Sequence, residues 1–497
     1  MRALKRVLSI IVALALVGAG VALGWAERAY PPPAPAAVSL EAVAVPPGDS
    51  VAVCPGALRL PTEGEGEPVY DPRFDPAATL VDSIGRVVAE GGQGGRSVPL
   101  GDAVATGLLA PLAVATETVG EAAVRIEAFS AESAPALATG ATFQHIGDGD
   151  LRGVAASPCI PAASEAWLVA GSTEPGSSGR VLLTNAGFTN VTADIEVWDG
   201  SGLVDAIGLT GLVVPPSSQR AVLLEGFVGD AARLALRVTA SGGELAVFLQ
   251  HSRLQGMTAG GVEIATPGLA PANQLVVPGL DVTDSTFDSL RASALRVLNP
   301  GESEAVLSVE LWGPDGPTTL PGLEEAAVGP GLVTDLSLAG LPAGRYAAVV
   351  TSDQPVVVAG LSLRSGEGEA PEEFAWSAST APQASGFAAL PGQDLTARLV
   401  VASQEASTLV ITPLGTNGEL GQPFSLAVPA RTAVALEPAE VGSAADAAAL
   451  RFAWEGATGY VALVVSAEDS AGSMVSAVVP RGHRSAATEV LVYPQVP

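Results

Sequence analysis

The side chains best suited to catalysis or metal binding are few in this chain and do not cluster in sequence. It contains three histidines, His145, His251 and His483, and two cysteines, Cys54 and Cys159. Neither a His-x-x-x-His nor a Cys-x-x-Cys spacing occurs, although zinc sites are commonly built from such pairs. The sequence therefore predicts no zinc site.

Nucleophilic catalysis has equally little support in the sequence. Neither Gly-x-Ser-x-Gly nor Ser-x-x-Lys occurs. The only lysine is Lys5, so none is available further along the chain for Schiff-base or general-base chemistry. The Gly-rich stretch that begins at Gly171, GSTEPGSSG, lacks the strand-to-helix context of a phosphate-binding loop.

Carboxylates are the abundant chemical group, with 52 Asp and Glu residues. The turn at residues 148–150 and the set Asp281, Asp284 and Asp288 offer oxygen ligands for calcium, but neither follows the twelve-residue calcium loop. Among so many acids, some pair will always have the spacing of the two catalytic carboxylates of a glycosidase. Such a pair is therefore weak evidence for a glycosidase. We therefore expect no catalytic, cofactor-binding or metal-binding residues and interpret the protein as a non-enzyme.

The distribution of aromatic and acidic residues bears on glycan binding. Trp198 and Trp312 occupy equivalent positions in an internal repeat, which favours packing between sheets over stacking on sugar rings. The denser acidic runs at residues 63–67 and 367–373 are typical of solvated loops. Glycan binding remains an alternative rather than the favoured interpretation.

That internal repeat, roughly a hundred residues long, organises most of the chain. Aligned stretches begin at Val181 (VLLTNAGFTNVTADIEVWDGSG), Leu295 (LRVLNPGESEAVLSVELWGPDG) and Leu399 (LVVASQEASTLVITPLGTNG). Each alternates apolar and polar residues as a strand does and leads into an Asp-Gly or Asn-Gly turn. Because a sandwich domain also needs about 100 residues, we predict an all-β fold of tandem immunoglobulin-like β-sandwich domains.

The repeat extends upstream through two Gln-His pairs, at 144–145 and 250–251, which are 106 residues apart (251 minus 145). GVAASPCIPAASEAWLVAG from Gly153 also resembles GVEIATPGLAPANQLVVPG from Gly261. These matches indicate a fourth, degenerate copy with an insertion between about residues 60 and 120. The expected domains cover residues 38–165, 166–275, 276–390 and 391–497.

The N-terminus carries the pattern of an export signal. Arg2, Lys5 and Arg6 precede an uncharged run of nineteen residues, Val7 to Trp25, which as a helix would be about 28 Å long. A secretory signal core is shorter, about 7–15 residues, so an uncleaved transmembrane signal anchor within residues 1–29 is favoured, with a cleaved signal as the alternative. The basic flank predicts a cytoplasmic N-terminus and an extracytoplasmic bulk. A Pro-rich spacer follows at residues 30–37.

Cysteine usage and charge agree with that location. Cys54 and Cys159 lie in one expected domain, and in an oxidising compartment such a pair predicts a disulfide, with two buried thiols or a thiol nucleophile as alternatives. The net charge of −28 argues against nucleic acid and anionic lipid as partners.

Several short phrases resemble those of actinobacterial exported, membrane-anchored proteins classed as a domain of unknown function. They are CPG at Cys54, the second cysteine Cys159, WLVAGST at Trp167 and VLLTNAG at Val181. The resemblance brings no catalytic residues or cofactors. It implies a Gram-positive envelope setting and a genomic neighbourhood of cell-wall glycan synthesis.

Two function hypotheses follow from these patterns. The first is a non-catalytic cell-envelope scaffold, attached to the plasma membrane by its N-terminal helix, that serves an unknown envelope protein or a glycan-assembly partner. The second is a secreted module that binds or cleaves glycan.

Overall fold

The computed structural model describes residues 2–29, 41–60, 80–101, 104–131, 135–289, 291–364, 372–441, 447–484 and 488–492. The chain forms two compact units. One comprises Met1–Pro46 with Ala487–Pro497, and the other comprises Pro47–Ala486.

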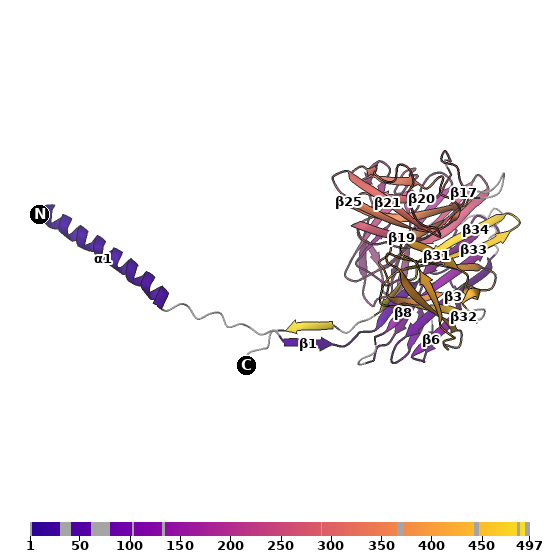
Figure 1. Ribbon diagram of the computed structural model, residues 1–497, viewed down its shortest axis with the longest axis horizontal. Coiled ribbons are helices and arrows are strands. Elements are labelled where there is room, and N and C mark those ends of the chain that lie inside the picture. The colour runs from indigo at the N-terminus through magenta and orange to yellow at the C-terminus, as the bar shows by residue number, and fades with distance from the viewer. Residues whose placement is uncertain are drawn as a thin grey trace. The chain divides into compact units, whose positions relative to one another are not determined.

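The smaller unit contains the helix α1 (Arg2–Ala29) and an antiparallel pair of strands, β1 (Glu41–Val45) and β36 (Thr488–Val492) (Figure 1). The uncharged run Val7 to Trp25 lies within α1. Within the described residues, no helix is both long enough and apolar enough to span a membrane. The transmembrane anchor expected from the sequence stays a prediction.

The larger unit is built from antiparallel β-sheets, so the prediction of an all-β fold is confirmed. The sheets form four two-layer sandwiches along the chain, and each sandwich has one sheet that we name the front sheet and one that we name the back sheet. The front sheets have the strand orders β2-β7-β4-β5, β10-β16-β12-β13, β19-β25-β21-β22 and β27-β32-β29-β30. The back sheets have the orders β6-β3-β8-β9, β15-β11-β17-β18, β24-β20-β25-β26 and β31-β28-β33-β34. All four sandwiches therefore share one topology.

The first two sandwiches are made of regular strands of this topology. The first contains β2 (Ser50–Cys54), β3 (Leu80–Glu90), β4 (Gly95–Pro99), β5 (Thr106–Leu108), β6 (Leu112–Thr118), β7 (Val124–Ala128), β8 (Leu137–Ile146) and β9 (Gly153–Pro158). The second contains β10 (Glu165–Leu168), β11 (Ser177–Asn185), β12 (Val191–Asp199), β13 (Gly202–Val204), β14 (Leu212–Val214), β15 (Ser218–Leu223), the 3-10 turn η1 (Leu224–Gly226), β16 (Ala235–Ser241), β17 (Ala246–Gln255) and β18 (Thr258–Ala265).

The third sandwich differs in one strand, because β25 is long enough to serve both of its sheets. It contains β19 (Ala272–Val282), β20 (Ala294–Leu298), β21 (Ala305–Gly313), β22 (Gly316–Thr318), β23 (Ala326–Val328), β24 (Val333–Ser337), β25 (Gly344–Arg364) and β26 (Glu373–Ala378). The first part of β25 pairs with β19 and β21 in the front sheet, and the second part pairs with β20 and β26 in the back sheet.

The fourth sandwich returns to separate strands. It contains β27 (Ser385–Ala389), β28 (Thr396–Ser403), β29 (Ser407–Gly415), β30 (Phe424–Val428), β31 (Thr432–Leu436), the 3-10 turn η2 (Pro438–Glu440), β32 (Ala447–Trp454), β33 (Tyr460–Asp469) and β34 (Gly472–Val478). The boundaries expected at residues 275 and 390 lie inside β19 and just after β27, so the first strand of each of these sandwiches begins upstream of its expected domain.

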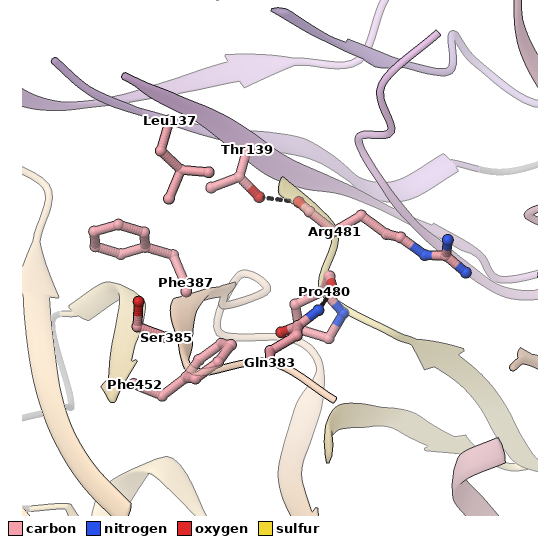
Figure 2. Close-up of a pocket in the computed structure, with 9 residues that line it drawn as sticks. Leu137, Thr139, Gln383, Ser385, Phe387, Phe452, Pro480 and Arg481 are labelled. Carbon is pink, nitrogen blue, oxygen red and sulfur yellow. Dashed lines mark hydrogen bonds between the residues drawn. The ribbon is translucent and has the colours of Figure 1, made fainter. Parts of the chain in front are cut away.

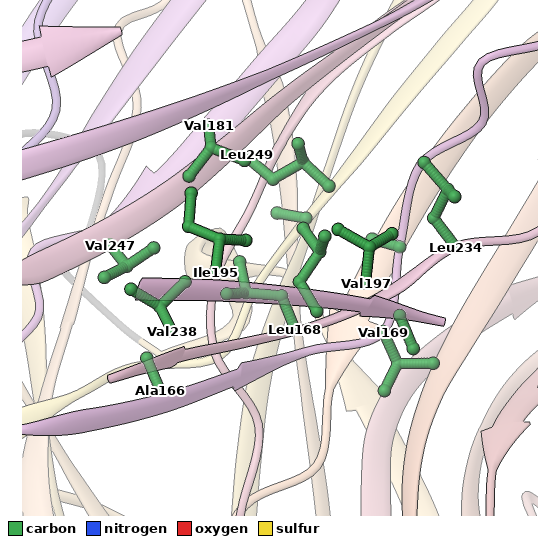
Figure 3. Packing of buried hydrophobic residues seen from close by; sticks show 14 of the residues in the cluster. Ala166, Leu168, Val169, Val181, Ile195, Val197, Leu234, Val238, Val247 and Leu249 are labelled. Atoms are coloured by element: carbon green, nitrogen blue, oxygen red, sulfur yellow. The ribbon is translucent and has the colours of Figure 1, made fainter. Parts of the chain in front are cut away.

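Alternation of apolar residues along the strands produces the cores. In the second sandwich, Ile195 and Val197 of β12 and Val238 of β16 face Val181 of β11 and Leu249 of β17 across the two sheets (Figure 3). All five side chains are buried. The period-two pattern that predicted strands therefore also identified the buried face.

The four sandwiches form a closed ring in which each back sheet packs against the front sheet of the preceding sandwich. Leu182 and Phe248 of the second sandwich pack with Val53 of the first, in the first seam of the ring. The other seams join the second and third, third and fourth, and fourth and first sandwiches through their own apolar clusters. Repetition of one head-to-tail contact closes into a ring when the rotation per unit permits it, as it does here within one chain.

Two further features describe this closure. The last strands of the sandwiches, β9, β18, β26 and β34, each contact the next around the centre of the ring. Near the end of the chain, β35 (Gly482–Arg484) adds to the back sheet of the first sandwich by pairing with Leu137 to Thr139 of β8.

Candidate functional site

The predicted disulfide between Cys54 and Cys159 is confirmed. Cys54 ends β2 in the front sheet, and Cys159 directly follows β9 in the back sheet. Beside the bond, the backbones of Val53 and Ile160 exchange two hydrogen bonds of 2.8 and 2.9 Å. The disulfide thus joins the first and last strands of the first sandwich.

The glutamines of the two Gln-His pairs hold Leu58 and Arg59, shortly after β2. The insertion predicted between about residues 60 and 120 is wrong for residues 80–118, which form β3 to β6 in the topology of the other sandwiches. The backbone N–H of Leu58 donates to Gln144 Oε1 (2.8 Å), and that of Arg59 donates to Gln250 Oε1 (3.0 Å). Gln250 Nε2 donates a hydrogen bond to the carbonyl of Arg59 (2.6 Å), so the side-chain amide of Gln250 bonds to both the N–H and the carbonyl of Arg59. The repeated pairs therefore tie one segment to two neighbouring sandwiches.

The histidines of these pairs lie in different sandwiches and are not brought together. His251 is fully buried, and its Nδ1 accepts a hydrogen bond from Trp376 Nε1 (3.2 Å). Burial lowers the pKa of His251 well below its ordinary value and also lowers the pKa of His145. His483 lies in β35. These positions correspond to structural roles in the strands.

Two of the aspartates considered for calcium, Asp281 and Asp284, have other partners. Asp281 is buried and forms ion pairs with Arg345 (3.1 Å) and Arg364 (2.7 Å). Asp284 accepts a hydrogen bond from the backbone N–H of Ala343 (2.8 Å). Among the described residues, no group of three or more His, Cys, Asp or Glu side chains is arranged to hold a metal ion. The acidic runs at 63–67 and 367–371 lie outside those residues.

The tryptophans at equivalent repeat positions pack at the seams of the ring. Trp198 and Trp312 are both buried, within the apolar clusters that join the second to the third and the third to the fourth sandwich. Leu414 takes the same register position in the fourth sandwich and contacts the first. The sequence-based preference for packing between sheets agrees with this geometry. At the seam between the second and third sandwiches, Arg296 also donates a hydrogen bond to the carbonyl of Gly171 (2.5 Å).

Two carboxyl groups that the sequence did not single out lie at the centre of the ring. Glu263 of β18 and Glu373 of β26 are fully buried. Ser476 Oγ of β34 lies 2.7 and 2.9 Å from the two carboxyl oxygens of Glu263 and accepts a hydrogen bond from the backbone N–H of Ala156 in β9 (2.8 Å). These hydrogen bonds connect β9, β18 and β34 at the centre.

Burial dominates the electrostatics of these carboxyl groups. Burial raises the pKa of Glu263 to about 8, although the hydrogen bond from Ser476 acts to lower it. Burial also raises the pKa of Glu373 well above its ordinary value. Burial therefore favours the neutral, protonated form of both acids. Gly261 leaves room for Glu373, because a Cβ there would lie 2.1 Å from Glu373 Oε1. An acid within the otherwise apolar run GVEIA was the one sequence signal for this site.

A small cavity of about 70 Å³ lies where the fourth sandwich meets the first (Figure 2). Leu137, Phe387 and Phe452 form its apolar wall, and Thr139 Oγ1 donates to the carbonyl of Arg481. The side chain of Arg481 points away from the cavity, and its Nη2 donates to two backbone carbonyls of other sandwiches. Ligand pockets usually have about 300–1,000 Å³, so this cavity is a packing gap of the closing seam.

Comparison with known proteins places most of the chain in one family model. The model of DUF5719, a family of unknown function, matches residues 113–439, more than half of the chain. A crystal structure of Thermotoga maritima 1070 is similar to a part of the chain at 18% identity and a TM-score of 0.19, covering 22% of this chain and 95% of that one. No curated protein matches.

Proposed function

The chain belongs to DUF5719, a family of unknown function, and we propose that it is a non-catalytic scaffold of the cell envelope. It would present the outer surfaces of a closed ring of sandwiches to an envelope protein or a glycan-assembly partner. The ring is the observation that carries the proposal, because its seams fix four sandwiches into one platform.

The use of the chemically versatile side chains supports this proposal. Trp198 and Trp312 are buried at seams, Gln144 and Gln250 hold backbone, and Asp281 is engaged with two arginines. The tryptophan and glutamine contacts fix the relative position of sandwiches, which is what a scaffold requires, and the ion pairs of Asp281 stabilise the third sandwich itself. A length of about 100 residues and a two-sheet build also support, as part of the proposal, the immunoglobulin-like character of each sandwich.

Location outside the cytoplasm is part of the same proposal. A disulfide is typical of an oxidising compartment, and Cys54 and Cys159 form one. The basic flank and the uncharged run of α1 are typical of an export signal that is either retained as an anchor or cleaved. The resemblance to actinobacterial exported proteins supports a Gram-positive envelope.

Crosslinking of the full chain in intact cells, followed by mass spectrometry, tests the proposal. A scaffold yields a reproducible envelope partner that disappears when the chain is deleted, and the N-terminal peptide reveals whether the signal is cleaved. Recovery of the chain only in the cytoplasm, or no partner together with an unchanged envelope after deletion, would refute it. A glycan-cleaving enzyme is the alternative, and release of products from cell-wall polysaccharide by the purified protein would favour it.

A further inference from the structure

One register position on the front sheets differs between the third sandwich and the other three. The residue at this position lies on β7, β16, β25 or β32. It pairs with a residue of the first strand of its sandwich on one side and with a residue of the third strand on the other. The position is occupied by Arg125, Arg237 and Arg451 in the first, second and fourth sandwiches. In the third sandwich it is occupied by Val349.

The arginines fill the outer face of their sheets beside the seam. Arg237 pairs with Glu165 (2.6 Å) and Glu196 (3.2 Å) in its own sandwich. Arg125 reaches across the seam to the carbonyl of Ala186 (2.7 Å) in the second sandwich. A long guanidinium side chain therefore occupies this space wherever the repeat carries arginine.

Val349 is too short to fill the same space, and a cavity of about 300 Å³ opens there between the third and fourth sandwiches. Gln274, Thr351 and Ser308 form a row across three adjacent strands at one side of the cavity. Gln404 of the fourth sandwich lines the cavity as well. The lining is thus rich in amide and hydroxyl groups, which both donate and accept hydrogen bonds.

A bidentate ion pair across the seam completes the lining. Arg431 of the fourth sandwich donates through Nε (2.8 Å) and Nη2 to the two carboxylate oxygens of Glu310, and this interaction lowers the pKa of that carboxyl. Trp312 Nε1 also donates to Glu310. The bidentate geometry fixes the orientation of both planar groups at the edge of the cavity.

Arg431 is placed there by an unusual backbone conformation. Its φ is 55°, in the left-handed region that favours glycine, and Gly331 has the matching turn in the third sandwich with φ 70°. The N–H of Arg431 donates to the carbonyl of Ser403 in β28, and that of Gly331 donates to the carbonyl of Asn299 just after β20, at 2.8 Å in each case. Ser217 takes the equivalent position in the second sandwich with φ 50°, so this conformation belongs to a turn that the sandwiches share, and in the fourth sandwich it carries an arginine.

We propose that this cavity, between the front sheet of the third sandwich and the fourth sandwich, binds a neutral polyhydroxylated ligand, one or two sugar units of a glycan. Its volume suits a small ligand, and its amides, hydroxyls and fixed ion pair match vicinal hydroxyl groups better than an apolar or charged molecule. The inference deepens the proposed function by naming the chemistry of the glycan partner, and it rests on that function for its biological meaning.

Val349→Arg tests the site directly, because it restores the residue that the other three sandwiches carry. The probes are glucose, galactose, mannose, arabinose, N-acetylglucosamine and their disaccharides, measured by ligand-observed NMR and calorimetry with the full chain. Wild-type protein is expected to bind at least one probe, and Val349→Arg to weaken that binding by about tenfold or more. Val213→Arg adds the same charge at an exposed position of the second sandwich and serves as the matched control.

A second variant keeps the result informative if the first one misfolds. Arg431→Gly retains a residue suited to the left-handed turn, as Gly331 shows, but removes the guanidinium from the cavity. It is expected to weaken binding while the melting temperature stays the same or rises. Absence of binding by wild-type protein to every probe, or equal binding by wild type and both variants, overturns the inference.

The scaffold proposal is tested separately, by the crosslinking experiment in wild-type cells. If the sugar-binding inference is wrong, the crosslinked envelope protein is still recovered from wild-type cells and the probes fail in vitro. If the scaffold proposal is wrong, the probes bind in vitro but no envelope partner is recovered. The two failures are therefore distinguishable.

Discussion

Replacing Glu263 by Gln is expected to make the protein more stable at neutral and alkaline pH and to change how its stability depends on pH. Glu263 is fully buried at the centre of the ring, and its folded-state pKa is raised by burial to about 8 from 4.5. Between these pH values the folded state holds a proton that the unfolded state has lost. Stability from this group is complete below pH 4.5 and is lost as the pH rises towards and through 8.

The magnitude follows from the two pKa values. Each pH unit between them costs the folded protein about 1.4 kcal/mol, so from pH 5.5 to 7.5 the loss is about 2.5 kcal/mol. Glutamine has nearly the same shape and does not ionise, and it keeps an acceptor for the backbone N–H of Ile264 (2.9 Å). The stability difference between Glu263→Gln and wild type should therefore grow by about 2.5 kcal/mol in favour of the variant over this interval.

Urea unfolding followed by tryptophan fluorescence at pH 5.5 and 7.5 measures this difference. Taking the difference between variant and wild type cancels the contribution of His145 and His251, which titrate in both proteins. Glu302→Gln, on an exposed turn of the third sandwich, controls for the loss of one formal charge. If the difference is the same at both pH values, Glu263 is ionised or solvated in the folded protein and the reasoning is refuted.

Three other substitutions probe the disulfide, a turn and a seam. Replacing Cys54 and Cys159 by Ser opens a loop with a sequence separation of 105 residues, and urea unfolding without reductant should show a loss of about 4–5 kcal/mol that reductant does not increase. Asn185→Ala removes bonds from its Nδ2 to two carbonyls (2.8 and 3.0 Å) and should cost about 1–3 kcal/mol, measured in the same way; an unchanged midpoint would contradict this role. Arg296→Met removes the buried partner of Asp335, which keeps its ion pair with Arg233 (3.2 Å), and should cost about 1–3 kcal/mol, with faster hydrogen exchange in β20, whereas exchange that rises only in distant strands would argue against a seam contact.

Local pattern in the sequence was sufficient to predict strands and turns. The phrases VLLTNAG and LRVLNPG contain Asn185 and Asn299, and each asparagine donates to two carbonyls and accepts from the N–H of the glycine two residues later. The fourth sandwich has Ser403 at this position and a different hydrogen bond, from its hydroxyl to the carbonyl of Thr458. The conspicuous repeat therefore reflects a repeated turn, and its weakest copy is the one where that turn is built differently.

These local patterns could not predict how the sandwiches pack against one another. Trp198 and Trp312 have the alternation of core residues, and only the placement of one sandwich on the next turns them into seam residues. The burial of Glu263 likewise depends on strands from all the sandwiches meeting at the centre. The seams have no local signature, and the only local sign of the central acids is a glutamate within the apolar run GVEIA, because the partners of these residues lie far away along the chain.

The pairing of β35 with β8 also fixes the order of events when the chain is made. The edge of β8 at Leu137 to Thr139 receives its partner from residues 482–484, which are synthesised about 340 residues later (482 minus 139). At about 5–20 residues per second, the first sandwich waits for roughly 20–70 s before the last seam can form. During that time its unpaired edge and apolar back face are open to other chains, so the nascent protein is vulnerable to aggregation until residues 482–484 have been made.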